Sequence, residues 1–137
     1  MTDAVPRIVV TAAVIRREDE FFVTRRQRGV HLEGLWEFPG GKCDAGESLE
    51  TCLRREIREE LDTDVRIGEE LLACAHRYPE RIVELHFFSA ELLGEPRPML
   101  GQEMRWVPRG ELCGLQFPPA DDELIDLLTA SEGPRRR

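Results

Sequence analysis

Hydrophobic positions along the chain occur in short runs that are separated by charged or breaker-rich turns. Many of these runs, such as RIVVTAAVI near the N-terminus, are rich in β-branched residues, which favour strands. The pattern predicts strands at Arg7–Ile15, Glu20–Thr24, Val65–Tyr78, Arg81–Leu92 and Met104–Val107. One stretch, Gly34–Cys43 (GLWEFPGGKC), is dense in glycine, proline and aromatic residues and is expected to be a shaped loop.

Two other segments show the helical spacing of apolar residues. Ser48–Leu61 is the main predicted helix, with Ser48 as its N-cap and Asp62-Thr63-Asp64 at its end. Ala120–Ala130 is the second predicted helix, with four apolar residues on one face. Strands before, between and after two helices predict an α+β fold, in which helices sandwich a mixed β-sheet.

The main predicted helix carries its acidic residues in an unusual arrangement. Its apolar stripe consists of Leu49, Leu53, Ile57 and Leu61. Glu56, Glu59 and Glu60 stand at i, i+3 and i+4, so their carboxylates converge on one face of the helix. Glu60 falls inside the apolar arc and Glu56 at its edge, where an unpaired charge is costly and normally has a cation nearby.

Two interpretations of these carboxylates stay open on spacing alone. They belong either to a solvated helix laced with Glu–Arg pairs or to a site for a hard divalent ion such as Mg²⁺ or Mn²⁺. The Gly40-Gly41 pair before the helix lets a ligand approach the main chain, and Lys42 places a cation beside it. The glycines and the lysine favour a site that handles phosphate together with a metal ion.

Composition and charge narrow the classes of function. The 137 residues fit one domain, 1–137, in which 131–137 form a basic tail. Apolar residues make up 41% of the chain and charged residues 34%, so it can build a core. A net charge of −8 disfavours nucleic-acid polymers and membrane surfaces as partners.

Cysteine spacing and the termini give no sign of a secreted or metal-knuckle protein. The four cysteines include no CxxC pair and are expected to be mostly reduced packing residues. The N-terminus lacks the layout of a signal peptide, and no apolar run reaches the roughly 18–20 residues that span a bilayer. These features predict a cytoplasmic protein.

The loop and the main helix together resemble the Nudix box, and the chain is identified on this basis as a member of the Nudix hydrolase family. The residues in register are Gly41, Glu47, Arg55-Glu56, Ile57 and Glu59-Glu60. Asp62 and Thr63 replace the glycine and the aliphatic residue that end the motif. FVTRR, LWEFPGGK, YPER and FPPAD extend the resemblance to the MutT-type branch, over roughly residues 7–128.

The resemblance implies a fold, a cofactor and a set of catalytic roles. The fold is an α/β/α sandwich around a mixed sheet, and the cofactor is Mg²⁺, with Mn²⁺ as a substitute. Glu56, Glu59 and Glu60 would hold the metal ion with the Gly40 carbonyl, while Arg55 steadies the box. Glu103, in GQEMRW, is the candidate for a further acidic ligand, and either it or Glu56 would be the general base.

The same resemblance places residues against the nucleotide. Arg26 and Lys42 would contact phosphates, and Phe38 and Tyr78 would stack on the base. Asp121 stands where bacterial 8-oxo-dGTP enzymes often carry an asparagine; an ionised aspartate only accepts hydrogen bonds, whereas an asparagine also donates. The remaining base-side candidates are Arg81 and Asp122.

The function implied is Mg²⁺-dependent hydrolysis of nucleoside triphosphates to monophosphate and pyrophosphate by a monomer. An oxidised purine nucleotide such as 8-oxo-dGTP is the first expected substrate, in which case the role would be to sanitise the nucleotide pool. The alternative is CTP, dCTP or 5-methyl-dCTP. A non-catalytic nucleotide-binding module fits less well, since a binder has no need of the whole carboxylate set, and an ADP-sugar or dinucleotide hydrolase would need extra segments.

Overall fold

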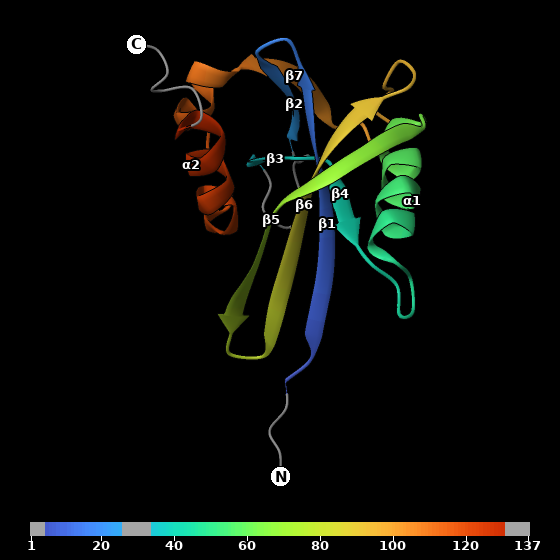
Figure 1. Ribbon diagram of the computed structural model, residues 1–137, viewed down its shortest axis with the longest axis vertical. Helices are drawn as coiled ribbons and strands as arrows, with labels where there is room; N and C mark the ends of the chain where they lie inside the picture. The colour runs from blue at the N-terminus through green and yellow to red at the C-terminus, as the bar shows by residue number, and fades with distance from the viewer. Residues whose placement is uncertain (1–4, 26–33, 131–137) are drawn as a thin grey trace.

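The computed structural model describes residues 5–25 and 34–130, which form a mixed sheet between two helices (Figure 1). The strands are β1 (Arg7–Arg17), β2 (Glu20–Arg25), β3 (Trp36–Glu37), β4 (Gly40–Lys42), β5 (Val65–Tyr78), β6 (Arg81–Leu92) and β7 (Glu103–Pro108). The helices are α1 (Leu49–Leu61), the 3₁₀ helices η1 (Arg109–Gly114) and η2 (Pro119–Asp121), and α2 (Asp122–Ala130). The α+β sandwich predicted from the sequence is confirmed.

Strand β1 is the centre of the sheet. The order along the sheet is β3-β2-β1-β6-β5, with β4 paired to β1 and β7 paired to β2. β1 and β6 run parallel, from Arg7 beside Ile82 to Ile15 beside Ala90, whereas the other pairs are antiparallel. The sheet is mixed for this reason.

The two faces of β1 supply two separate cores, because successive strand residues point to opposite faces. Ala13 and Ile15 pack with the buried face of α1, in a cluster that includes Leu53, Ile57 and Leu61. Ala12 and Val14 pack toward α2, in a cluster that includes Leu124, Ile125 and Leu128. The helices accordingly cover opposite faces of the sheet (Figure 1).

Most predicted elements form, and the main departure is the loop. The segment Gly34–Cys43, expected as irregular, contains the short strands β3 and β4. β4 forms because Gly40 and Gly41 lie against Ala12 and Thr11 of β1, a pairing between residues far apart in the sequence. The predicted tail 131–137 lies outside the described residues. Within the described part of the chain, no helix is long and apolar enough to cross a membrane.

Arg109 is a buried cation that joins the first turn of the chain to the last helix. Its side chain is 6% exposed, and its Nε donates to the Asp19 carboxylate at 2.8 Å. Its Nη1 donates to the Leu128 carbonyl at 2.6 Å, and its guanidinium lies 5.2 Å from the ring centre of Phe21. These contacts hold η1 and α2 against the sheet.

We expect Arg109→Met to lower the free energy of unfolding by about 2–3 kcal/mol, because it leaves the Leu128 carbonyl without this donor. Asp19→Asn is the matched control; the Asp19 carboxylate is 67% exposed, so its loss should cost less than about 1 kcal/mol. Urea unfolding monitored by circular dichroism measures both. Equal losses in the two variants would contradict this account of Arg109.

Candidate active site

Helix α1 begins and ends at two local caps, which set the position of its carboxylates along the helix. The Ser48 hydroxyl accepts a hydrogen bond from the Thr51 amide at 3.1 Å, which confirms the predicted N-cap. At the other end, Asp62 adopts the left-handed conformation with a φ of 55°. Aspartate tolerates this conformation better than most residues, so it serves in the place where the motif has glycine.

The glycine pair of β4 lies directly against the carboxylates of α1. A β-carbon at Gly41 would collide with the Glu56 carboxylate, and one at Gly40 would collide with the Thr11 carbonyl. The main chain of β4 therefore approaches both β1 and α1 as closely as it does only because both residues are glycine. Lys42, the last residue of β4, has an exposed side chain.

Arg55 is the cation at the centre of the box. Its Nε and Nη2 bind the two Glu47 carboxylate oxygens at 2.8 and 2.9 Å. Its Nη1 donates to Glu56 at 3.0 Å and lies 3.3 Å from Glu59, and its Nη2 also donates to the Lys42 carbonyl at 3.1 Å. The guanidinium lowers the pKa of Glu47 to about 2, so Glu47 is ionised at neutral pH.

Glu60 is a partly buried carboxyl group beside Glu56. Burial, with the negative charges of Glu37 and Glu56, raises the pKa of Glu60 to about 9. A backbone hydrogen bond at Gly40 opposes this rise, and Glu56 shares a side-chain hydrogen bond with Glu60. Because buried carboxylates repel one another, this group fits a bound divalent cation, which would compensate their charge.

Glu103 lies at the start of β7, where its carboxylate pairs with Arg25 at 3.3 Å. The pairing follows from strand register, since Glu103 faces Arg25 across β2 and β7. In the described part of the chain, no hydrogen bond or ion pair connects Glu103 to the box carboxylates. The structure thus brings Glu56, Glu59 and Glu60 together and leaves Glu103 with a different partner.

Two of the candidate base-side residues, Phe38 and Asp121, lie on the face of the sheet that α2 covers. Asp121 is 8% exposed, and burial together with the charges of Glu37 and Asp122 raises its pKa to about 7. Phe38 is 5% exposed and stacks on Phe117 with ring centres 5.3 Å apart, so its ring is part of the core.

The other predicted nucleotide contacts differ in their accessibility. Tyr78 is 40% exposed where β5 ends, and the Arg81 guanidinium lies 5.7 Å from its ring centre. Asp122 is exposed in the first turn of α2. Arg26 lies outside the described residues.

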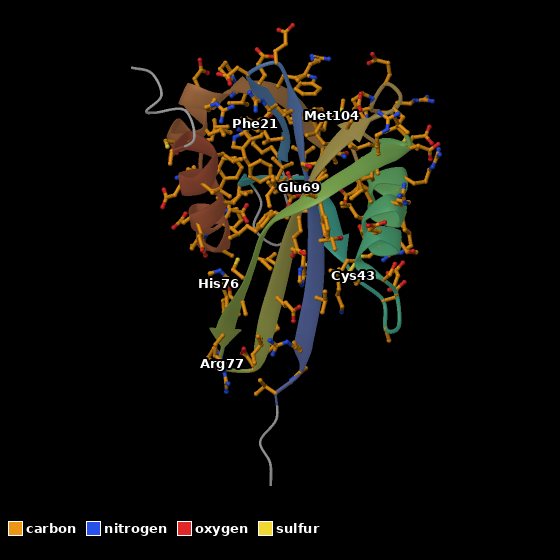
Figure 2. The ribbon with its side chains drawn as sticks, viewed as in Figure 1. Phe21, Cys43, Glu69, His76, Arg77 and Met104 are labelled. Atoms are coloured by element: carbon orange, nitrogen blue, oxygen red, sulfur yellow. A yellow bond between two sulfur atoms is a disulfide. The ribbon has the colours of Figure 1, made fainter. Side chains whose placement is uncertain are left out.

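Sequence reasoning gave Glu37 no role in the site. Glu37 raises the pKa of both Glu60 and Asp121, so its charge reaches the metal side and the base side of the site. His76 projects from β5 on the side of α2 (Figure 2), and its buried Nε2 has no hydrogen-bond partner among the described residues. Glu37 lies within the LWEFPGGK segment, but its effect on these two carboxyl groups depends on the pairing of β3 with β2 in the folded chain.

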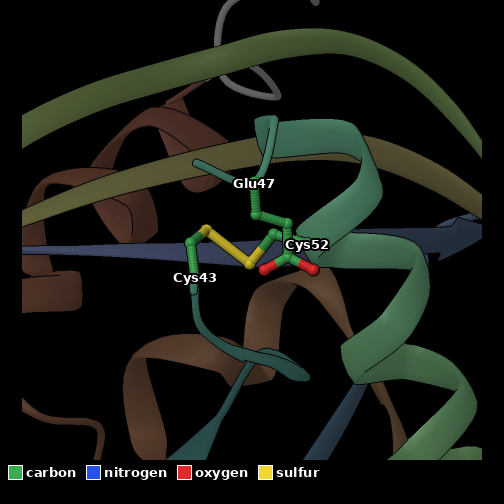
Figure 3. A group of neighbouring side chains, drawn as sticks. All are labelled: Cys43, Glu47 and Cys52. Carbon is green, nitrogen blue, oxygen red and sulfur yellow. A yellow bond between two sulfur atoms is a disulfide. The ribbon is translucent and has the colours of Figure 1, made fainter. Parts of the chain in front are cut away.

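The expectation that the cysteines are mostly reduced packing residues is wrong for two of them. Cys43 and Cys52 form a disulfide, with α-carbons 5.2 Å apart and Glu47 beside them (Figure 3). The two cysteines are nine positions apart in the sequence, and this spacing does not predict a disulfide. They come together because β4 lies against the start of α1 in the folded chain. Cys74 and Cys113 are free.

Comparison with known proteins agrees with this geometry. The family model for the NUDIX domain matches residues 10–127. The chain is a Nudix hydrolase. Its relatives place it in the MutT-type branch of that family.

Two relatives and one solved structure are similar to this Nudix hydrolase over nearly the whole chain. The chain is 39% identical to the 8-oxo-dGTP diphosphatase of Haemophilus influenzae, over 88% of this chain and 90% of the relative. It is 33% identical to the CTP pyrophosphohydrolase of Escherichia coli, over 93% and 96%. The solution structure of the E. coli ORF135 protein superposes with a TM-score of 0.84 at 30% identity, covering 96% and 95%.

In the metal-free Nudix hydrolase, we expect Glu60→Gln to raise the melting temperature at pH 7.5 by about 3–6 °C. The pKa of Glu60 is about 9 in the fold and near 4.5 in an ordinary carboxyl, so the folded state binds the extra proton. The resulting destabilisation is absent below pH 4.5 and grows as the pH rises toward 9.

Calorimetry in EDTA at pH 4.5 and pH 7.5 tests this expectation. Glu59→Gln is the matched control, because its carboxylate is 56% exposed and should leave the melting temperature unchanged. Glu60→Gln melting below the wild type at pH 7.5 would contradict it.

Proposed function

We propose that this Nudix hydrolase cleaves nucleoside triphosphates to monophosphate and pyrophosphate with Mg²⁺, and that an oxidised purine nucleotide such as 8-oxo-dGTP is its main substrate. The observation that supports the proposal is the cluster of Glu56, Glu59 and Glu60, gathered around Arg55 and lying against the glycine pair of β4. Removal of oxidised nucleotides from the precursor pool would be the cellular consequence.

The chain's own residues would bind and orient the triphosphate. Glu56, Glu59 and Glu60 would hold the metal ion, with the Gly40 carbonyl as a main-chain ligand. When bound, that ion supplies charge neutralisation and an acidified water. Lys42, exposed beside the glycines, would contact a phosphate oxygen.

Proton removal is assigned to Glu56 rather than Glu103. The Glu56 carboxylate is oriented by Arg55 at 3.0 Å and shares a hydrogen bond with Glu60, so it lies within the carboxylate cluster. Glu103 would join only after its ion pair with Arg25, at 3.3 Å, is exchanged. Arg55 contacts Glu47 and Glu56 and acts as a positioning residue.

Asp121 is proposed to contact the base, and its protonation state would decide what it reads. With a pKa of about 7, it can be a carboxylic acid that donates and accepts, or a carboxylate that only accepts. The acid suits the donor–acceptor edge of an oxidised purine. Tyr78 supplies an exposed ring for stacking beside Arg81, while Asp122 acts through its charge on Asp121.

The second candidate substrate is a cytosine nucleotide, that is CTP, dCTP or 5-methyl-dCTP. The observation that favours it is the same residue in its ionised form, since a carboxylate accepts from the exocyclic amine of cytosine. One similar protein is a CTP pyrophosphohydrolase, at 33% identity.

A substrate panel with Mg²⁺ tests the proposal, with pyrophosphate release measured for 8-oxo-dGTP, 2-hydroxy-dATP, dGTP, CTP, dCTP and 5-methyl-dCTP. We expect the largest kcat/KM for 8-oxo-dGTP and a loss of at least about 10²-fold in Glu56→Gln, which lacks a metal ligand and base. A preference for the cytosine nucleotides would transfer the proposal to the second candidate. Release from none of them would contradict hydrolysis of triphosphates.

We expect Asp121→Asn to remove a pH dependence of KM between pH 6 and pH 8, because the amide keeps a donor and an acceptor throughout. At each pH, the KM of the variant is divided by the wild-type KM for the same nucleotide, which cancels titration of the substrate. Loss of the transition then appears as a ratio that changes between pH 6 and pH 8. Asp122→Asn should keep the transition but move it to lower pH, since the Asp122 charge raises the pKa of Asp121. A transition unchanged in Asp121→Asn would exclude Asp121 as its source.

A further inference from the structure

The disulfide between Cys43 and Cys52 joins the two elements that build the candidate metal site. Cys43 follows directly after Lys42 of β4, and Cys52 lies in the first turns of α1 (Figure 3). The segment that they enclose contains Glu47, the residue that binds Arg55 through both oxygens. The disulfide therefore ties the segment between β4 and α1 to the helix, as the Glu47–Arg55 ion pair also does.

The two cysteines are fixed to β1 and to the glycine-containing strand β4 by polar contacts. The Cys43 amide donates to the Val9 carbonyl at 2.8 Å, which fixes one end of the bridge to β1. The Cys52 sulfur is 3.3 Å from the Thr11 hydroxyl and 3.8 Å from the Gly41 carbonyl. A reduced Cys52 can donate its S–H to one of these oxygens, so the site accommodates both thiol and disulfide.

The two sulfurs differ in their access to solvent. Cys52 is fully buried, whereas Cys43 is partly exposed beside the exposed turn 44–46. Thiol–disulfide exchange needs an accessible attacking sulfur, which makes Cys43 the first to react and Cys52 the second. Cys74 and Cys113 are free and take no part in the bridge.

We propose that Cys43 and Cys52 form a thiol–disulfide switch that sets the affinity of the box for its divalent metal ion, with the disulfide form binding more tightly. The oxidant is a small disulfide such as glutathione disulfide. The Cys43 thiolate attacks it, forming a mixed disulfide and releasing one glutathione thiol. The Cys52 thiolate then attacks the Cys43 sulfur and releases the second. Two cysteine protons and two electrons leave the protein, and one disulfide becomes two thiols.

The expected effect follows from what the bridge restrains. Without it, no covalent bond closes the 43–52 segment, and the exposed turn 44–46 can separate Glu47 from Arg55. Arg55 orients Glu56, so its displacement loosens a proposed metal ligand. This switch rests on the proposed metal site, and its experiment separates the two.

Mn²⁺ titration of the full chain, followed by electron paramagnetic resonance, tests the switch after equilibration with reduced or oxidised glutathione. Alkylation and intact-mass analysis establish the thiol state, and amide hydrogen exchange follows residues 40–48. We expect the Mn²⁺ dissociation constant of the disulfide form to be lower by about threefold or more, with slower exchange at 40–48. Reduction should also lower the melting temperature by about 5–10 °C.

Cys43→Ser should bind Mn²⁺ like the reduced wild type in both buffers, whereas Cys113→Ser, which changes an exposed free thiol, should respond like the wild type. Equal Mn²⁺ affinity in two verified redox states would overturn the switch and leave the metal site standing. Failure of oxidised glutathione to form the bridge would also overturn it. Mn²⁺ binding in neither state would refute the proposed metal site, and the switch with it.

Discussion

The two-oxygen ion pair between Arg55 and Glu47 is the interaction on which the rest of the site depends. It connects the turn after β4 to α1, and the same guanidinium reaches Glu56, Glu59 and the carbonyl of Lys42. One planar cation with five donors can satisfy such a set, whereas an ammonium could not bind both oxygens in one plane. The single positive charge of Arg55 therefore orients three carboxylates but balances only part of the local acidic charge.

The negative charge of the cluster is not balanced by Arg55 at Glu60. Arg55 stabilises the ionised form of Glu47, but Glu60 lies beyond its reach and has a pKa of about 9. Glu37 adds negative charge to Glu60 on one side and to Asp121 on the other. A single acidic residue of β3 thus raises the pKa of two buried carboxyl groups, Glu60 beside α1 and Asp121 beside α2.

Local determinants made α1 predictable in detail. Ser48, the apolar stripe and Asp62 act within a few residues of one another, and the helix begins and ends where they indicate. The β4 strand and the bridge at Cys43 depend instead on contact with β1 across the folded sheet. Periodicity carries no information on such contacts. The site was accessible from sequence where one helix presents its groups, and inaccessible where separate strands bring them together.

The two-faced packing of β1 has a consequence for the order in which the chain can fold. β1 is synthesised before the other strands of the sheet and has apolar residues on both faces, yet its parallel neighbour β6 is made only after α1 and β5. Pairing over this sequence distance is slow, because the entropy cost of closing a long loop comes before the stabilising contacts between the strands can form. The nascent β1 consequently remains without its parallel neighbour until β6 has been synthesised, so the central pairing of the sheet forms late.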